Sequence, residues 1–307
     1  MATAARAALI AWLSLGLAAC AVGRGPRAAV SPAAAYWCPM HPDVRGHAGE
    51  RCPKCQMELV PASTVIGDAY AVDVELNPRL VAPRQKTRVR LHVREPGTGA
   101  TVKRFDVVHE KVFHLFVISR DLEYFTHVHP VLRADGALDV DIELPRAGLY
   151  QLVADFVPAG GPPQVVQKSI ITAGHEGPLL GDLVLTADTD DKVIAGTRVR
   201  LGMREAMAGG QRLMTFELLD EASGRPASGL EPYLGATGHL VLMSADMSVA
   251  SHSHPVAERA ALPSSVAFQV LFPRAGTYRV WVQFQRSGKV MTASFTIPVQ
   301  DRYRTGT

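Results

Sequence analysis

The sequence predicts a mainly β protein in which two tandem immunoglobulin-like β-sandwich domains follow a small Cys/His module. Three observations lead to this fold class. Apolar and polar residues alternate with period two from about residue 67 onward, proline and glycine interrupt the alternation at short intervals, and several blocks of residues occur twice. No segment after the first twenty residues has the period of a long helix. This combination is typical of β-sandwiches.

The expected strands of the first copy are short segments rich in β-branched and aromatic residues, which suit a pleated, half-buried surface. They cover residues 70–74, 88–93, 115–119, 138–144, 150–156 and 167–172. Alternation places one face of each strand in the core. We therefore expect large apolar residues of these patterns to pack in the interior, namely Tyr150, Tyr278, Trp281, Phe284, Met243 and Met247.

The two halves of the chain are internally repeated. Thr-Arg-Val-Arg-Leu at 87–91 recurs at 197–201, an offset of 110, whereas the histidines of the first half recur 125 residues later. Arg-Ala-Gly-x-Tyr at 146–150 recurs at 274–278, an offset of 128. These offsets suggest an insertion of 15 residues in the second copy. The offset between the copies changes only by lengths that a loop can accommodate, which indicates two homologous domains. We expect these domains at residues 65–175 and 179–300.

The N-terminus is expected to be a lipoprotein signal peptide, residues 1–19, followed by a flexible tether at 20–35. A single arginine precedes an apolar run that is too short to span a membrane. Leu-Ala-Ala-Cys at 17–20 resembles the bacterial lipobox, in which the cysteine, here Cys20, becomes the lipidated first residue. Acyl chains would hold the exported protein on the periplasmic side of a membrane. A plain signal cleaved after Ala19 is the alternative.

Resemblance to sorted lipoproteins favours the outer membrane, if the cell has one, because alanine and not aspartate follows Cys20.

The other three cysteines lie between residues 36 and 62, where we expect a metal-binding module. One C-x2-H pair precedes one C-x2-C pair. A spacing of two residues lets a tight turn direct both side chains at one ion, and two such pairs make a four-coordinate Cys3His site. A redox pair or a lone disulfide is the alternative, but it would leave the first pair without a role. The expected ligands are Cys38, His41, Cys52 and Cys55.

Two methionines, Met40 and Met57, lie within two residues of these ligands. Their thioethers are soft donors, which favour Cu(I) or Ag(I) as well as Zn(II). The segment YWCPMHPDVRGHAGERCPKCQMELVP at 36–61 resembles the heavy-metal-binding domain that accompanies bacterial copper and silver efflux proteins. Gln56 departs from the glycine that is usual in that family, but it removes no ligand. The resemblance implies a copper, silver or zinc ion and, as partners, components of an efflux pump or its adaptor.

Each copy also carries a His-x12-His-x-His-Pro pattern. Side chains two apart in a strand share a face. If 115–119 and 125–129 form a hairpin that turns near 120–123, the first histidine lies opposite the third and the three imidazoles meet. Three histidines suit Cu(II) or Zn(II) with a fourth position open; hydrogen-bonded structural histidines are the alternative. The triads are His114, His127, His129 and His239, His252, His254.

Because each triad belongs to its own domain, we expect two independent metal sites. Four further histidines have no counterpart in the other copy, and we expect them at the surface: His47, His92, His109 and His175.

These features together predict an exported, lipid-anchored, non-enzymatic protein that captures or hands off copper, silver or zinc. A formal net charge of +3, spread along the chain, indicates no nucleic-acid-binding patch. An efflux adaptor would need a long helical hairpin, and a copper enzyme would need an acid, base or nucleophile beside the triads; neither is visible. A structural or partner-binding lipoprotein, in which zinc only staples residues 36–61, is the remaining alternative.

Overall fold

The computed structural model describes residues 36–37, 44–47, 49–53, 59–61, 70–176, 183–203, 205–209, 211–256 and 264–301. Within these ranges the chain forms strands and turns, so the predicted mainly β fold class is confirmed. No helix among these residues is long and apolar enough to cross a membrane. The expected signal peptide, the tether and Cys20 lie outside the described residues.

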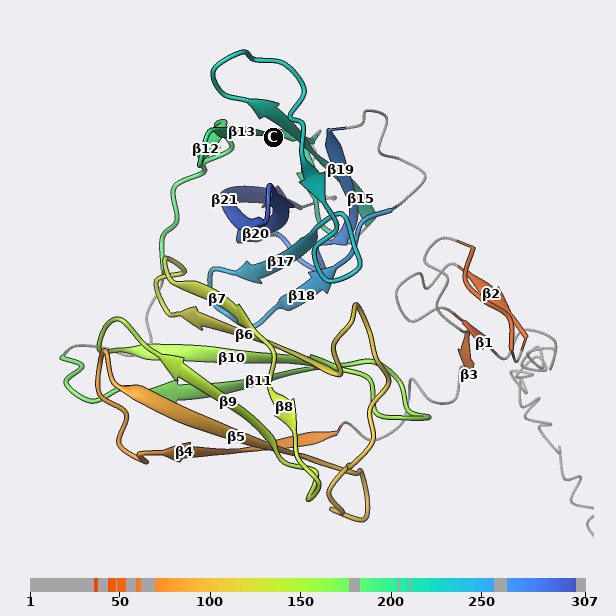
Figure 1. The fold of residues 1–307 in the computed structure, drawn as a ribbon, viewed down its shortest axis with the longest axis vertical. Coiled ribbons are helices and arrows are strands. Elements are labelled where there is room, and N and C mark those ends of the chain that lie inside the picture. The colour runs from red at the N-terminus through yellow and green to blue at the C-terminus, as the bar shows by residue number, and fades with distance from the viewer. Residues whose placement is uncertain are drawn as a thin grey trace, which may run out of the picture.

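The first repeat is a sandwich of two four-stranded sheets (Figure 1). Its strands are β4 (Ala71–Asn77), β5 (Lys86–Arg94), β6 (Phe113–Ser119), β7 (Phe125–Val128), β8 (Val131–Leu132), β9 (Leu138–Glu143), β10 (Leu149–Phe156) and β11 (Gln164–Ile171). One sheet has the order β4-β5-β9-β8 and the other β11-β10-β6-β7. All six segments expected as strands in this copy are strands.

The alternation in β5 shows how the sequence builds this sandwich. Its inward residues, Val89 and Leu91, are buried in the core of the first repeat. Arg88, on the opposite face, pairs with Asp141 of β9 at 2.7 Å. Alternate residues of a strand point to opposite faces, so a shift of one residue would bury the arginine and expose the core.

The second repeat also contains two sheets. Its strands are β12 (Lys192–Ile194), β13 (Thr197–Gly202), β14 (Ala206–Met207), β15 (Gln211–Asp220), β16 (Leu230–Glu231), β17 (His239–Ser244), β18 (Ala250–Ser253), β19 (Ser265–Leu271), β20 (Gly276–Arg286) and β21 (Lys289–Gln300). One sheet has the order β12-β13-β15-β19. The other has the order β14-β21-β20-β17-β18, with β16 added beside β20.

The Arg-Ala-Gly-x-Tyr motif forms the same corner in both repeats. The hydroxyl of Tyr150 donates to the carbonyl of Arg146, and that of Tyr278 donates to the carbonyl of Arg274, both at 2.9 Å. Both tyrosines are buried, as expected. A tyrosine that bonds to backbone a few residues upstream is a feature of immunoglobulin-like sandwiches, so the motif recurs because it fixes this corner.

The strand register corrects the predicted alignment of residues 87–91 with residues 197–201. In the first repeat Leu91 of β5 pairs with Leu138, and in the second Phe216 of β15 pairs with Val266. All four residues are buried, so the counterpart of β5 is β15, at the same offset of 125 as the histidines. The second Thr-Arg-Val-Arg-Leu lies in β13, the neighbour of β15, as β4 is the neighbour of β5. No insertion of 15 residues is needed. Short alternating segments are too alike to define a register by themselves.

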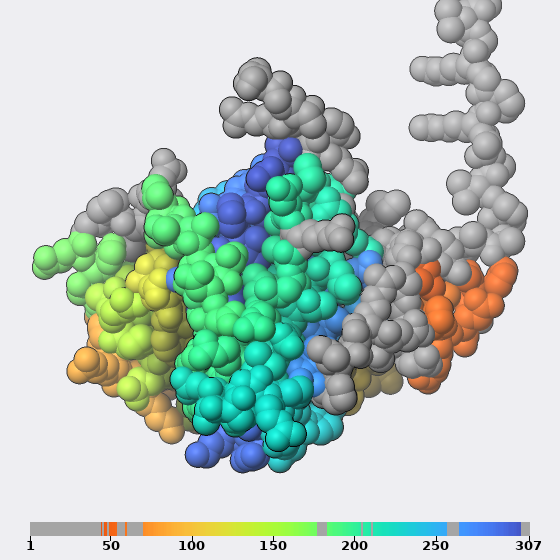
Figure 2. Space-filling model, turned by 90° about the horizontal axis from the view of Figure 1, so that it is seen from above, coloured from red at the N-terminus to blue at the C-terminus, as the bar shows by residue number. Residues whose placement is uncertain are grey.

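The two repeats pack against each other through the sheets that contain β6 and β17 (Figure 1). Figure 2 shows the first repeat, in yellow and yellow-green, lying against the second repeat, in green to blue. Phe125 of β7 stacks on Trp281 of β20, with ring centroids 4.9 Å apart. Met243 and Met247 are packing residues, as predicted, but they pack between the repeats. This interface cluster consists of Phe116, Ile118, Leu122 and Val153 from the first repeat with Val241, Met243, Met247 and Trp281 from the second.

Candidate metal centre

The first histidine triad gathers on the β6–β7 hairpin, which pairs Leu115 with Val128. Continuing this register places His114 opposite His129, as expected from the sequence. The Nε2 atom of His127 lies 3.0 Å from Nδ1 of His114 and 3.1 Å from Nε2 of His129. The three possible ligand atoms lie within 4.8 Å of one another.

The second triad repeats this arrangement on the β17–β18 hairpin. Leu240 pairs with Ser253, which places His239 opposite His254. Nδ1 of His239 lies 3.2 Å from Nε2 of His252, and the possible ligand atoms of this triad also lie within 4.8 Å of one another. Nε2 of His254 is buried and has no hydrogen-bond partner among the described residues.

Backbone carbonyls determine which nitrogen of the first histidine carries the proton. Nε2 of His114 donates to the carbonyl of Val108 at 3.0 Å, and Nε2 of His239 donates to the carbonyl of Tyr233 at 2.9 Å. A carbonyl only accepts hydrogen bonds, so the proton is on Nε2 and Nδ1 offers a lone pair to the triad. Both carbonyls belong to tight turns at equivalent positions, 108–111 and 233–236.

The middle histidine of each triad is oriented by the opposite repeat. Nδ1 of His127 donates to Oε1 of Gln283 at 2.8 Å, and Nδ1 of His252 donates to Oδ2 of Asp155 at 2.6 Å. The Nε2 atoms of both histidines therefore carry lone pairs that face their own triads. Such outer hydrogen bonds fix the tautomer and the ring orientation of histidine ligands.

The two triads meet at the interface between the repeats. Ring centroids of His114 and His252 are 5.3 Å apart, and those of His127 and His239 are 5.9 Å apart. The expectation of two distant, independent sites is therefore wrong. It assumed that separate domains imply separate sites, whereas the hairpins that carry the histidines are the surfaces through which the domains pack.

His109 is a seventh member of this histidine cluster. It lies on the 108–111 turn, and its ring stacks on that of His254 with centroids 3.7 Å apart. The expected surface position is wrong for His109, which is half-buried, and also for His92; His47 and His175 are exposed. Repetition could not reveal His109, because the equivalent turn of the second repeat has Leu234 in its place. Both residues have a positive φ.

Burial keeps the clustered histidines neutral. Loss of solvation lowers the pKa of His129 to about 4 and that of His239 to about 3, with further lowering from neighbouring imidazoles. The pKa values of His252 and His254 lie well below the ordinary value for the same reasons. Burial raises the pKa of Asp155 to about 6, so its carboxylate is still ionised at neutral pH. Neutral imidazole is the form that binds a metal, so no proton has to leave these rings first.

The donor set fits a tetrahedral or more open site for a borderline divalent ion. A zinc ion with nitrogen ligands at roughly 2.0–2.1 Å requires N···N separations of ~3.3 Å in tetrahedral geometry. The observed separations of 3.0, 3.1 and 3.2 Å are close to this value. Lone pairs that face one another at this distance repel unless a cation or a proton lies between them.

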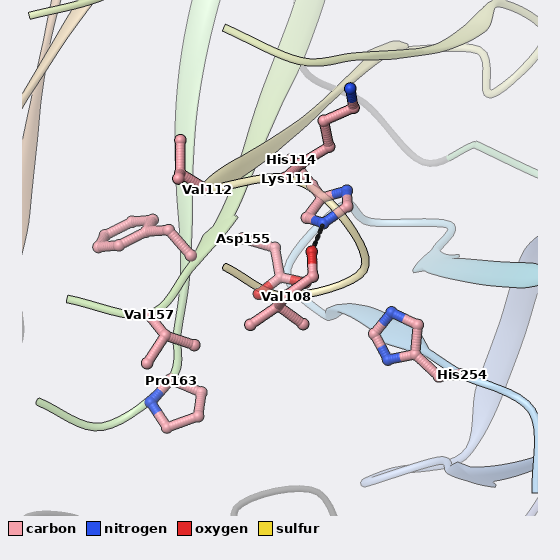
Figure 3. A pocket seen from close by; sticks show the side chains of 9 residues that line it. Val108, Lys111, Val112, His114, Asp155, Val157, Pro163 and His254 are labelled. Atoms are coloured by element: carbon pink, nitrogen blue, oxygen red, sulfur yellow. Dashed lines mark hydrogen bonds between the residues drawn. The ribbon is translucent and has the colours of Figure 1, made fainter. Parts of the chain in front are cut away.

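A small pocket reaches both triads (Figure 3). His114, Asp155 and His254 form part of its wall, together with the apolar Val108, Val112, Phe156, Val157 and Pro163 and the cationic Lys111. Figure 3 shows His114 and His254 approaching it from the two repeats. The pocket therefore lies where one histidine of each triad, His114 and His254, contributes to the same wall.

The N-terminal module is described only in part. β1 (Tyr36–Trp37) pairs with both β2 (Arg45–Gly46) and β3 (Val60–Pro61) in a small antiparallel sheet. Cys52 and Leu59 are buried. The other expected ligands and methionines of this module lie outside the described residues: Cys38, Met40, His41, Cys55 and Met57.

Distant structural similarity links the chain to several bacterial proteins. The adhesin FdeC of Escherichia coli shares 15% identity over 76% of this chain and 66% of its own, with a TM-score of 0.25. CopC of Methylosinus trichosporium OB3b shares 14% identity over 35% of this chain and 99% of its own, with a TM-score of 0.24. The adhesin InvE of Yersinia pseudotuberculosis shares 9% identity over 74% and 58%, with a TM-score of 0.22.

Family models match most of the sequence, although no curated protein matches it. The model described as heavy metal binding domain matches residues 35–62, the segment of the Cys/His module. A second model matches twice, at 64–172 and 191–301, and its two matches cover both sandwiches and all six histidines of the triads. Because these two matches span more than half of the sequence, the chain belongs to the family described as domain of unknown function (DUF8832).

Proposed function

We propose that the protein is an exported, lipid-anchored metal carrier with two kinds of metal site. The heavy metal binding domain takes an ion that binds thiolates, Cu(I), Ag(I) or Zn(II), and the histidine triads between the repeats take Cu(II) or Zn(II). Its role is to capture these ions outside the cytoplasm or to hand them to another protein, such as a component of an efflux pump. One observation carries this proposal: three neutral imidazole nitrogens converge in each triad.

Two features favour metal ligands over structural histidines. Histidines kept for structure should end in complete hydrogen-bond networks, since an unpaired buried polar group costs about 1–3 kcal/mol. Nε2 of His254, however, is buried without a partner. In addition, the outer hydrogen bonds of His114 and His127 leave two lone pairs 3.0 Å apart. Both features are relieved by a bound cation.

A binding role fits the cluster better than catalysis does. The carboxylate of Asp155 already accepts a hydrogen bond from His252. Its role is therefore to orient this possible metal ligand. An alternative remains the structural lipoprotein, in which zinc in residues 36–61 is the single bound ion. Metal stoichiometry separates the two, because that alternative predicts no ion in the triads.

The test is the metal content of the full chain with Cys52→Ser and Cys55→Ser, which disable the N-terminal module. We expect this variant to retain two Zn(II) ions per chain after dialysis, measured by elemental analysis and by titration calorimetry. Adding His129→Gln or His254→Gln, each of which removes one possible ligand, should lower the content to one ion per chain. Absence of any retained zinc in the parent variant would contradict the proposed triad sites.

Anchoring is tested at Cys20. Cys20→Ser removes the sulfur to which lipid would attach, so we expect the protein to move from the membrane fraction to the soluble periplasmic fraction. Two acyl signals hold a protein on a bilayer stably, whereas none remains in the variant. Fractionation followed by immunoblotting measures this, with Ala21→Ser as the matched control. Continued sedimentation of the Cys20→Ser protein with membranes would point to an uncleaved signal anchor.

A further inference from the structure

The two triads are nearly equivalent, but one residue behind each of them differs. Asp155 of β10 lies opposite His114 in the first repeat, and Gln283 of β20 lies opposite His239 in the second. They occupy the same position in the two sandwiches. Each accepts the Nδ1 proton of the middle histidine across the interface. A carboxylate therefore supports the second triad, and a neutral amide supports the first.

This difference has a direct electrostatic consequence. A carboxylate behind a histidine ligand makes the imidazole more basic and places a negative charge near the ion. An amide fixes the same ring without supplying charge. Because the side chain of Asp155 is only 19% exposed and that of its partner His252 is 1% exposed, water screens this charge only weakly.

A second difference between the triads also favours metal binding at the second triad. His109 adds an imidazole beside the second triad, 3.7 Å from the ring of His254 and 5.5 Å from that of His239. The first triad lacks this addition, because Leu234 occupies the equivalent place in the other turn. A divalent ion in the second triad would also repel another ion in the first, since the two triads share one interface.

We propose that the triads form one asymmetric pair of sites, in which a divalent ion fills His239, His252 and His254 before a second ion fills His114, His127 and His129. This order of filling rests on the proposed metal binding and adds that the second triad has the higher affinity. Asp155 and Gln283 are positioning residues that set this order from the opposite repeat.

Two isosteric substitutions exchange the roles of these positions. Asp155→Asn keeps a side-chain oxygen that accepts from His252 but removes the charge. Gln283→Glu keeps the acceptor for His127 and adds a charge. Both changes, singly and together, are made in the full chain carrying Cys52→Ser and Cys55→Ser, and Zn(II) binding is followed by stepwise titration calorimetry with a competing chelator.

The parent should bind zinc in two separable steps, and His254→Gln should remove the tighter one. Asp155→Asn should weaken the tighter step by about 10- to 100-fold, the usual effect of altering a partner behind a metal ligand. Gln283→Glu should strengthen the weaker step. In the double exchange the tighter step should move to the first triad, so that His129→Gln and no longer His254→Gln removes it. A gain of affinity cannot arise from damaged folding.

The outcomes separate this inference from the proposed function. Two ions bound with equal affinity, or a tighter step that stays at the second triad in the double exchange, would overturn the asymmetric order and leave metal binding intact. Unchanged zinc affinities in both Asp155→Asn and Gln283→Glu would also overturn the asymmetric order. No zinc bound by the parent would overturn both.

Discussion

The metal-free protein is expected to unfold in mild acid, with its free energy of unfolding falling steeply from about pH 6.5 downward. Burial lowers the pKa of the clustered histidines, to about 4 for His129 and about 3 for His239. In the unfolded chain the same rings bind protons near pH 6.5. Below that pH the unfolded state holds more protons, so stability decreases as the pH falls. Each ring that stays neutral in the fold contributes about 1.4 kcal/mol per pH unit.

Other charged groups near the cluster do not reverse this sign. Burial raises the pKa of Asp155 to about 6, so this one carboxyl stabilises the fold as the pH falls between about 6 and 4. Lys111 lies close enough to lower the pKa of His114 and His129 further. Several histidines therefore outweigh one carboxyl. Over two pH units their sum is comparable to the roughly 5–15 kcal/mol that hold a typical domain folded.

Thermal unfolding in a chelating buffer between pH 7.5 and pH 4 measures this dependence. His239→Gln removes one titrating ring and should reduce the slope of stability against pH. Leu271→Ala, at an exposed apolar position, should leave that slope unchanged. A melting temperature that stays constant across this range would contradict the buried, neutral state of the histidines.

Replacing Trp281 with alanine is expected to cost about 3–5 kcal/mol and to separate the unfolding of the two repeats. Trp281 is 3% exposed and fills the interface cluster, where it stacks on Phe125. Each repeat has its own core, distinct from this cluster. The cavity should therefore weaken docking more than it weakens either sandwich.

Calorimetric unfolding should then show two transitions, whereas a single transition is expected for the parent protein. Zinc affinity should fall as well, because Gln283 lies two residues from Trp281 on β20 and orients His127. The control is again Leu271→Ala, which removes a side chain of similar apolar character from a surface position, with an expected cost within about 0.5 kcal/mol. A single transition with unchanged midpoint in the Trp281→Ala protein would mean that the interface contributes little.

The sequence predicted the sandwiches and the members of each triad because both depend on local patterns. Period-two alternation identified the strands, and the spacing of His114, His127 and His129 sufficed to place three imidazoles on one hairpin. The repeat itself indicated which histidines belong together. These inferences need only the geometry of a strand and a turn.

Three features required the structure because they depend on how the repeats dock. Apolar outer faces at Phe116 and Trp281 are indistinguishable in sequence from faces turned to a core. The contact of His109 with His254 crosses the interface, as do the hydrogen bonds made by Asp155 and Gln283. No local pattern specifies such contacts.

The reciprocal hydrogen bonds across the interface give this chain the geometry of a homodimer joined into one polypeptide. His127 of the first repeat bonds to the second at the position where His252 of the second bonds to the first. In a dimer of identical subunits, both of these acceptors would be the same residue, and the two sites would be identical by symmetry. Covalent linkage removes that constraint. One acceptor is aspartate and the other is glutamine. Two identical copies of a single-repeat protein could not place different residues at these two positions.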